Sequence, residues 1–321
     1  MTGIASTMEH PIGTYGLFEL RIGHGDVRLR GVDGTVVRVR DRLGHDLSEL
    51  FRIERGEGSL SLQTPGPDVR SLVGGPWRRS PELDVEVPAK ATIVVETGSA
   101  EVDAEGLVGS QSFRTASGDV TLRGAGGAIA VDAVSGEVEV TAVAPSKLTI
   151  RTVSGDVAIR AGTIEGLEAA TTSGDIRVAG RLDDAGFFAI ETVSGDAILA
   201  PASGVRIEAA SVTGDIRSDL EAHIQRDGGR QAIEVGSGGP TVSFRSMSGD
   251  LRVVRAEPLG DDAHRVPSSD PSVEQPTVVD GGADDRLDIL RALERGDIDV
   301  AEARSRLEAL DASVPAGHEH D

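Results

Sequence analysis

Seven acidic side chains in this sequence each follow a glycine directly, and the spacing of the first six hardly varies. The acids are Asp119, Glu137, Asp156, Asp175, Asp196, Asp215 and Asp250, and the glycines before them are Gly118, Gly136, Gly155, Gly174, Gly195, Gly214 and Gly249. Repeated carboxylates can bind divalent cations, because these ions prefer oxygen ligands, and a pair of carboxylates can hydrolyse a glycosidic bond. Either chemistry needs acids that lie close together in space. Whether they do depends on the secondary structure that carries them.

Short alternating apolar runs lie on both sides of the acid-bearing tripeptide, whose usual form is Ser-Gly-Asp. The glycines, starting from Gly98 in a weaker Thr-Gly-Ser version, are separated by 20, 18, 19, 19, 21, 19 and finally 35 residues. A period of two in the flanking runs indicates β-strands with one buried face. The inward positions predicted in this way are Leu148, Ile150, Thr152, Ser154, Val157 and Ile159 in one unit, and Ile129, Val131, Ala133, Ser135, Leu167, Ala169, Thr171, Ser173, Val242, Phe244, Ser246 and Ser248 in others.

A single unit of about 19 residues is too small to fold alone. Burying four to six aliphatic side chains contributes roughly 6–18 kcal/mol, whereas ordering that many residues costs at least about 19 kcal/mol in backbone entropy. Stacked units share their apolar faces and their strand hydrogen bonds, so the repeat predicts an all-β, parallel β-solenoid with strands about 4.8 Å apart. A propeller is the main alternative, but each of its blades needs about 40 residues.

The repeated tripeptide has a structural interpretation as the corner of each coil. Glycine accepts a positive φ there, and the flanking Ser and Asp side chains can bind nearby backbone N–H groups. Acids stacked at coil spacing would repel one another, and arginines a few positions later could compensate; these are Arg123, Arg160, Arg177, Arg217 and Arg252. Bound divalent cations are the alternative, although the nonapeptide pattern of calcium-binding β-rolls is absent.

Five segments follow from the distribution of these patterns. Residues 1–82 are expected to form irregular β coils or a cap, and residues 83–255 the regular solenoid. In the 35-residue step before Gly249 we expect two coils, with residues 236–239 as the corner that lacks the motif. The loop around Trp77 is expected to pack on the cap. Residues 256–283 are polar and rich in proline, as in a disordered acidic linker.

The last part of the chain predicts a small helical hairpin at residues 284–311, followed by a disordered tail at residues 312–321. Two helices of about a dozen residues make a marginal core on their own, so a partner or a second copy should cover their apolar side. The residues expected to make that contact are Leu287, Leu290, Leu293, Ile298, Ala303 and Leu307. The hairpin is therefore a candidate for self-association or for binding a protein partner that the sequence does not identify.

Composition narrows the function classes. The net charge of −21 disfavours nucleic acid and anionic lipid surfaces as partners. There is no cysteine, which excludes disulfides and thiolate metal sites. No apolar run approaches the roughly 18 residues of a membrane helix, and residues 1–16 contain His10, Pro11 and Gly13 where a signal peptide needs an apolar stretch. We therefore expect a cytoplasmic protein without a cofactor and without direct membrane insertion.

Residues 83–102, with Val-Pro-Ala at 87–89 and Thr-Gly-Ser at 97–99, followed by Ser-Gly-Asp-Val at 117–120, resemble the DUF4097 family of bacterial β-strand repeat proteins. The resemblance covers roughly residues 15–255 and implies a β-solenoid-like domain without an established catalytic centre, under a family label of adhesin. Residues 286–303 look like the short SHOCT-like helical hairpins that accompany such domains, some in envelope-stress proteins. Those hairpins imply oligomerisation or protein binding.

An enzyme is not expected. No coil between Gly98 and Val253 carries a distinctive His, Tyr or Trp cluster, and no Ser-His-Asp order, phosphate loop or zinc-ligand spacing is present. The acids recur as a structural rule and not as one convergent pair. Two non-enzymatic interpretations stay open: a cytoplasmic scaffold that binds a protein partner near the envelope, and a surface adhesin exported by an unconventional route.

Overall fold

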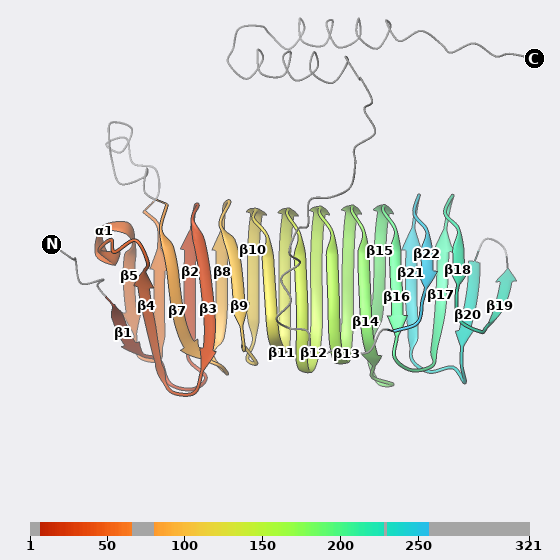
Figure 1. The fold of residues 1–321 in the computed structure, drawn as a ribbon, viewed down its shortest axis with the longest axis horizontal. Helices are drawn as coiled ribbons and strands as arrows, with labels where there is room; N and C mark the ends of the chain where they lie inside the picture. The colour runs from red at the N-terminus through yellow and green to blue at the C-terminus, as the bar shows by residue number, and fades with distance from the viewer. Residues whose placement is uncertain (1–6, 66–79, 228–229, 257–321) are drawn as a thin grey trace, which may run out of the picture. The chain divides into compact units, whose positions relative to one another are not determined.

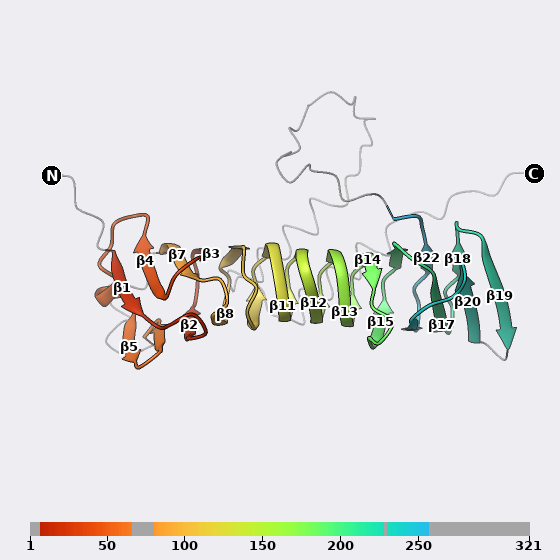
Figure 2. The same ribbon diagram turned by 90° about the horizontal axis from the view of Figure 1, so that it is seen from below.

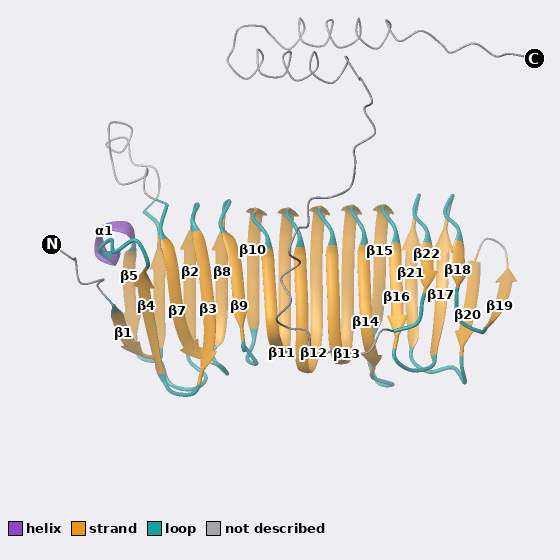
Figure 3. Ribbon diagram, in the orientation of Figure 1, coloured by secondary structure: helices purple, strands orange, loops and turns teal. Residues whose placement is uncertain are grey.

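The structure is a computed structural model that describes residues 7–65, 80–227 and 230–256. Alternating apolar residues form strands throughout this part of the chain, and hydrogen bonds join all of them into one continuous sheet. The predicted parallel β-solenoid is confirmed, because every regular coil pairs in parallel with the coils beside it. Figure 1 shows the coils side by side along one axis, and Figure 3 shows how completely strands dominate.

Each coil has two straight segments separated by a bend, so the stack has two faces (Figure 2). The entry face contains the strands that lead into the Ser-Gly-acid corner and the strands in register with them. These are β6 (Ser59–Gln63), β2 (Leu17–Ile22), β8 (Thr92–Thr97), β10 (Gln111–Ser117), the second halves of β11 (Val120–Ser135), β12 (Val138–Ser154) and β13 (Val157–Ser173), then β15 (Phe188–Ser194), β21 (Thr241–Ser246) and β17 (Val205–Ser211).

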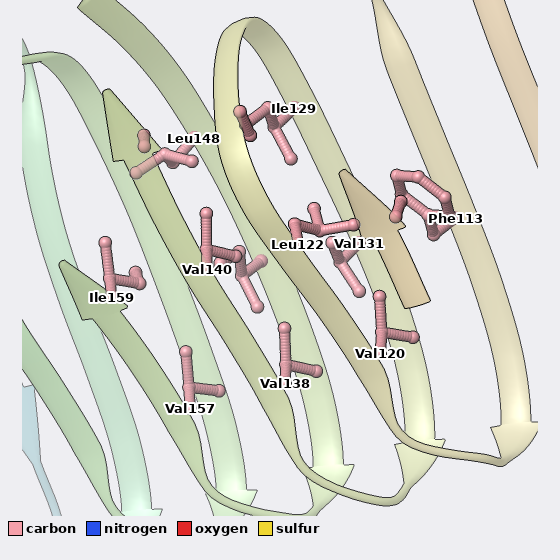
Figure 4. Packing of buried hydrophobic residues seen from close by; sticks show 14 of the residues in the cluster. Phe113, Val120, Leu122, Ile129, Val131, Val138, Val140, Leu148, Val157 and Ile159 are labelled. Atoms are coloured by element: carbon pink, nitrogen blue, oxygen red, sulfur yellow. The ribbon is translucent and has the colours of Figure 1, made fainter. Parts of the chain in front are cut away.

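The exit face contains the strands that leave the corner. These are β7 (Glu82–Pro88), β3 (Asp26–Val32), β9 (Glu101–Glu105), the first halves of β11, β12 and β13, then β14 (Ile176–Leu182), β16 (Ala197–Pro201), β22 (Leu251–Val253) and β18 (Ile216–Ser218). Inward side chains of the two faces pack against each other to form one apolar core (Figure 4). In that view Val120, Val138 and Val157 follow one another across successive coils of the exit face, as do Leu122, Val140 and Ile159.

Antiparallel strands close both ends of the stack. At the N-terminal end, β4 (Val36–Asp41) pairs with β1 (Met8–Pro11) and β7, and β5 (Arg52–Gly56) pairs with β6. A short helix, α1 (Leu47–Leu50), begins after its N-cap Asp46. At the other end β17 continues into β20 (Arg230–Val235) and β19 (Ala222–Asp227).

The coils do not stack in strict chain order. The coil of β2 and β3 is inserted between the strands β6 and β7 and the strands β8 and β9. At the opposite end, the coil of β21 and β22 is inserted between the coil of β15 and β16 and the coil of β17 and β18. The strands of an inserted coil are paired on both sides. The first and last coils of the solenoid in chain order are therefore held between other coils.

Two expectations from the sequence were wrong. The 35-residue step before Gly249 contains the antiparallel hairpin of β19 and β20, and residues 236–239 connect this hairpin to β21 instead of forming a solenoid corner. An alternating pattern records which side chains are buried and carries no information on strand direction. Of the serines predicted to point inward, Ser246 is buried. Ser154, Ser173 and Ser248 are exposed and Ser135 is half-buried, because each strand is already turning at that position.

Candidate functional site

The Ser-Gly-acid tripeptides all lie at one corner, where the entry face passes into the exit face. Their positions follow the coils: Gly118 and Asp119 before β11, Gly136 and Glu137 before β12, Gly155 and Asp156 before β13, Gly174 and Asp175 before β14, Gly195 and Asp196 before β16, Gly214 and Asp215 before β18, and Gly249 and Asp250 before β22. In space the last two rungs exchange places, so that Asp250 lies between Asp196 and Asp215.

Close stacking of the backbone explains the glycines. A Cβ atom on Gly155 would lie 2.1 Å from the carbonyl oxygen of Gly136 in the preceding coil. A Cβ atom on Gly195 would lie 2.0 Å from the carbonyl oxygen of Gly174. Real Cβ contacts are never so short. Of the seven corner glycines, Gly136 and Gly174 also adopt positive φ values, of 114° and 150°. The steric reason applies along the whole row, whereas the conformational reason that the sequence suggested applies to part of it.

The acids form a hydrogen-bonded row along the corner, which we call the acid row. In four cases an aspartate Oδ1 accepts the backbone N–H of an aspartate in the adjacent coil, and in a fifth Asp119 accepts that of Glu137. The donor–acceptor distances are 2.8 Å from Glu137 to Asp119, 2.9 Å from Asp175 to Asp156, 3.0 Å from Asp196 to Asp175, 2.9 Å from Asp250 to Asp196 and 2.7 Å from Asp215 to Asp250. A hydrogen bond from a backbone N–H group to a carboxylate is stronger than one between neutral groups. The row is thus part of the structure that joins one coil to the next.

The arginines expected to neutralise the acid row do so only in part. Arg177 contacts Asp175 at 2.9 Å and Asp156 at 3.7 Å, and Arg217 contacts Asp215. The other three bind acids elsewhere on the exit face: Arg123 binds Asp103, Arg160 binds Glu139 and Arg252 binds Asp219. In the described part of the chain, no Arg, Lys or His lies within ion-pair distance of Asp119, Glu137, Asp196 or Asp250.

The acid row continues into the N-terminal coils, where the sequence did not reveal it. Glu82, Asp26 and Glu101 occupy the same register position, one residue before an inward apolar side chain. Before Glu101 the corner position is occupied by Ala100 instead of glycine, so the sequence does not contain the tripeptide there. The signal that could have found these residues is the acid followed by apolar residues at alternate positions, as in Glu101-Val102-Asp103-Ala104.

A second row consists of inward hydroxyl groups near the end of the entry-face strands. Thr115 is buried, and its Oγ1 accepts the N–H of Gly118 at 2.9 Å. The equivalent Thr152, Thr171, Thr192 and Ser246 are also buried, but their hydroxyls have no hydrogen-bond partner among the described residues. We expect each of these hydroxyl groups to lower the stability of the coil that contains it.

A third row is apolar and exposed, and we call it the apolar row. It occupies the position three residues before the acid in the six coils from Glu137 to Asp215, at the same corner. From one end to the other it consists of Val134, Val153, Thr172, Val193, Met247 and Val212. The exposed fractions of its five large apolar residues run from 43% at Val193 to 77% at Val212. This row was not predicted from the sequence.

A shallow hollow of about 470 Å³ lies on the exit face beside the last rungs of the acid row. Asp196, Asp250 and Asp215 line it, together with Arg217 and Arg252. Arg252 is held by two hydrogen bonds from its guanidinium to Asp219, at 2.6 and 2.9 Å, which raise the pKa of Arg252. Within the described residues, no three His, Cys, Asp or Glu side chains are arranged to hold a metal ion. The hollow therefore offers uncompensated carboxylates to a cationic group from outside the chain.

A family model described as Toastrack DUF4097 matches residues 71–254, which is more than half of the chain. The chain belongs to this family. The resemblance inferred from residues 83–120 is thereby confirmed. Among curated proteins, no match to the Toastrack chain was found.

Solved structures with a similar fold share little sequence with this Toastrack chain. A putative lipid binding protein from Parabacteroides distasonis ATCC 8503 is 15% identical, with a TM-score of 0.43 over 79% of this chain and 98% of the other. A putative adhesin from Bacteroides fragilis NCTC 9343 is 12% identical, with a TM-score of 0.37 over 77% of this chain and 96% of the other. Similarity at this level carries no information on what the Toastrack chain binds.

The predicted contact residues of the helical hairpin, and with them the SHOCT-like resemblance, lie outside the described residues. They are Leu287, Leu290, Leu293, Ile298, Ala303 and Leu307. The same is true of Trp77, of the linker from residue 257 onward and of the tail at residues 312–321. In the part of the Toastrack chain that the structure describes, no helix is long and apolar enough to cross a membrane.

Proposed function

We propose that this Toastrack protein is a non-enzymatic interaction scaffold, in which the stacked coils present a rigid surface to a protein partner. The observation that carries the proposal is the use of the corner residues. The repeated acids, which are the groups best suited to chemistry, serve as acceptors for backbone N–H groups of the next coil. A row of apolar side chains beside them is left exposed. This division favours binding over catalysis.

Affinity capture from cells of the native host tests the scaffold function. The full-length protein should retain a specific protein that a boiled or urea-unfolded sample does not retain. A folded protein that retains nothing above the level of an unrelated acidic protein would refute the scaffold function. A hydrolytic activity that depends on Asp196 or Asp250 would replace it with an enzymatic function.

As part of the same proposal, residues 284–311 mediate self-association or partner binding. The support is the spacing of Leu287, Leu290 and Leu293, which places apolar side chains on one side of a helix. Light scattering of the full chain and of a chain lacking residues 284–321 tests this assignment. Deletion should lower the solution mass or abolish partner capture, and a chain that lacks only residues 312–321 is the control. If both properties survive the longer deletion, the segment has no role in assembly.

The proposal places the scaffold in the cytoplasm, near the envelope. Fractionation of native cells, followed by protease treatment of intact cells, tests the location. Protein that stays in the soluble or inner-face fraction and resists protease supports the scaffold, whereas protease-sensitive protein on the outer surface would indicate an adhesin.

A further inference from the structure

The apolar row is unusual among the exposed residues of this protein because it repeats at one structural position. Val134, Val153, Val193, Met247 and Val212 come from five different coils and lie at the same corner. With Thr172 they occupy six consecutive rungs, which at about 4.8 Å per rung gives a stripe of about 24 Å. A contiguous exposed apolar stripe on a soluble protein commonly marks an interaction site.

Strand propensity is the competing explanation for this row, since β-branched residues are favoured in strands. Strand propensity explains why a valine occurs at any one of these positions. It does not account for Met247, which is not β-branched and is 60% exposed. It also does not explain why no charged side chain occurs at this position from Val134 to Val212, although charges are frequent on the rest of the surface.

The charges next to the apolar row indicate what kind of partner would cover it. Each apolar residue lies three positions before a member of the acid row. Asp196 and Asp250, on adjacent rungs, have no cationic partner among the described residues, and both line the hollow on the exit face. Two carboxylates at rung spacing repel each other, and an external ammonium or guanidinium group would relieve that repulsion.

The same charges exclude the acidic occupants that this chain itself could supply. A second copy would bring another net charge of −21 and its own acid row. The segment from Arg255 to the C-terminus contains 17 acids and 7 arginines, so its own net charge is −10. Complementarity therefore points to a different protein with a basic surface.

The spacing of the rungs indicates the secondary structure of the partner. An α-helix has a pitch of 5.4 Å, so one apolar residue per turn stays close to rungs about 4.8 Å apart over several turns. A β-strand laid along the row repeats its side chains on one face only about every 6.6 Å, and loses register after one or two rungs. The two rows are three residue steps apart along the chain, which span at most about 11 Å. This distance is close to the diameter of a helix with its side chains.

We propose that the corner formed by the apolar row and the acid row binds a basic amphipathic helix of a partner protein. The apolar side of the helix lies on Val153, Val193, Met247 and Val212, and its Lys or Arg side chains reach Asp196 and Asp250. About 16 helical residues would cover the 24 Å stripe at 1.5 Å per residue. The proposal rests on the scaffold function and specifies the surface and the partner class for it.

Binding of designed peptides to the full-length protein tests this surface. The probe is an 18-residue peptide with leucines along one helical side and lysines flanking them. Two further peptides serve as comparisons: the same residues in scrambled order, and the helix with glutamate in place of lysine. Fluorescence anisotropy should show the basic amphipathic peptide binding at least tenfold more tightly than either comparison.

Variants of the protein separate the two rows. The triple variant Val153→Thr, Val193→Thr and Val212→Thr keeps the β-branched shape and should weaken binding about tenfold or more. The double variant Asp196→Asn and Asp250→Asn keeps a side-chain oxygen that can accept the backbone N–H of the next coil. It should weaken binding to a similar extent and reduce its dependence on salt concentration.

Val143→Thr is the matched control, because Val143 is 73% exposed but lies at the opposite bend of its coil. It should leave binding unchanged, and far-UV circular dichroism should be the same for all variants. Equal binding of the scrambled peptide, no binding of the helix, or full binding by the triple valine variant would each overturn the proposal. A host protein captured equally well by wild type and by the triple valine variant would leave the scaffold function standing and remove this docking site.

Discussion

The buried hydroxyl row allows a test of the fold in which the same substitution has opposite effects at two equivalent positions. Thr115 and Thr171 both point inward at the end of an entry-face strand, and their exposed fractions are 6% and 5%. The Thr115 hydroxyl accepts the N–H of the buried Gly118 at 2.9 Å. The Thr171 hydroxyl has no partner in the described part of the chain. Valine has nearly the shape of threonine, so Thr→Val removes the hydroxyl and leaves the packing largely intact.

The two changes in unfolding free energy should differ in sign. A buried hydroxyl without a partner costs about 1–3 kcal/mol, so Thr171→Val should stabilise the protein by about 1 kcal/mol. Thr115→Val leaves the Gly118 N–H without its acceptor, which should destabilise the protein by about 1–2 kcal/mol. The difference between the variants is then about 2–3 kcal/mol, although the two threonines are equally buried.

Urea unfolding followed by circular dichroism measures this difference. The midpoint should rise for Thr171→Val and fall for Thr115→Val, with little change in the slope of the transition. Thr172→Val is the control, because Thr172 is exposed and its substitution should change stability by no more than about 0.5 kcal/mol. If Thr115→Val and Thr171→Val shift the midpoint in the same direction, the assignment of hydrogen bonds along this row is wrong.

Two further predictions concern the corner and the N-terminal cap. Gly155→Ala should destabilise the protein by about 1–3 kcal/mol or more, because its Cβ would meet the Gly136 carbonyl at 2.1 Å, whereas Gly162→Ala, whose nearest contact would be at 3.9 Å, should be tolerated in thermal unfolding. Asp46 accepts hydrogen bonds from the N–H and hydroxyl of Ser48, which lower the pKa of Asp46 in the folded state. The stability from this N-cap is therefore present above the unfolded pKa of about 3.9 and is lost as pH falls through the folded value. The urea midpoints of wild type and Asp46→Ala should differ at pH 7 and converge at acidic pH; a constant difference would contradict this origin.

The regular coils could be predicted from sequence because burial and periodicity determine them together. In the coil of β12 and β13, Leu148, Ile150, Val157 and Ile159 are all inward and almost fully buried, as the alternation indicates. Glycine at intervals of about 19 residues also marked the corner of each coil. Stacking distances are the same for every coil, so a local repeat is sufficient to predict the parallel arrangement.

The order of the coils could not be predicted, because it depends on which strand edges remain free at each end. The pattern around β21 is the same as in any other coil, yet this strand pairs with β15 and β17. Nothing in residues 241–246 distinguishes pairing with the preceding hairpin from insertion two strands away. The correct partners emerge only when β19 and β20 occupy the edge of β17 as an antiparallel hairpin.

The role of the corner residues could be predicted only in part from the sequence, for a related reason. The sequence shows that glycine and an acid recur, and it suggests local explanations within one turn. In the structure both residues act between coils: Gly155 allows the close approach of Gly136, and Asp156 accepts the backbone N–H of Asp175. Contacts between coils involve residues about 19 positions apart, and a reading of a single turn cannot reveal them.

The inserted coils at both ends explain how this surface can be rigid over so many rungs. In a repeat protein each unit contacts only its neighbours, so a terminal unit is held on one side and is the least stable. Here the coil of β2 and β3 and the coil of β21 and β22 are paired on both sides. Among the strands left at the edges, β5 and β19 carry exposed charged residues such as Arg52, Glu54 and Arg226, which oppose pairing with a further chain. Binding along the rungs from Val134 to Met247 therefore does not have to order a fraying end, and the entropy that such ordering would cost is avoided.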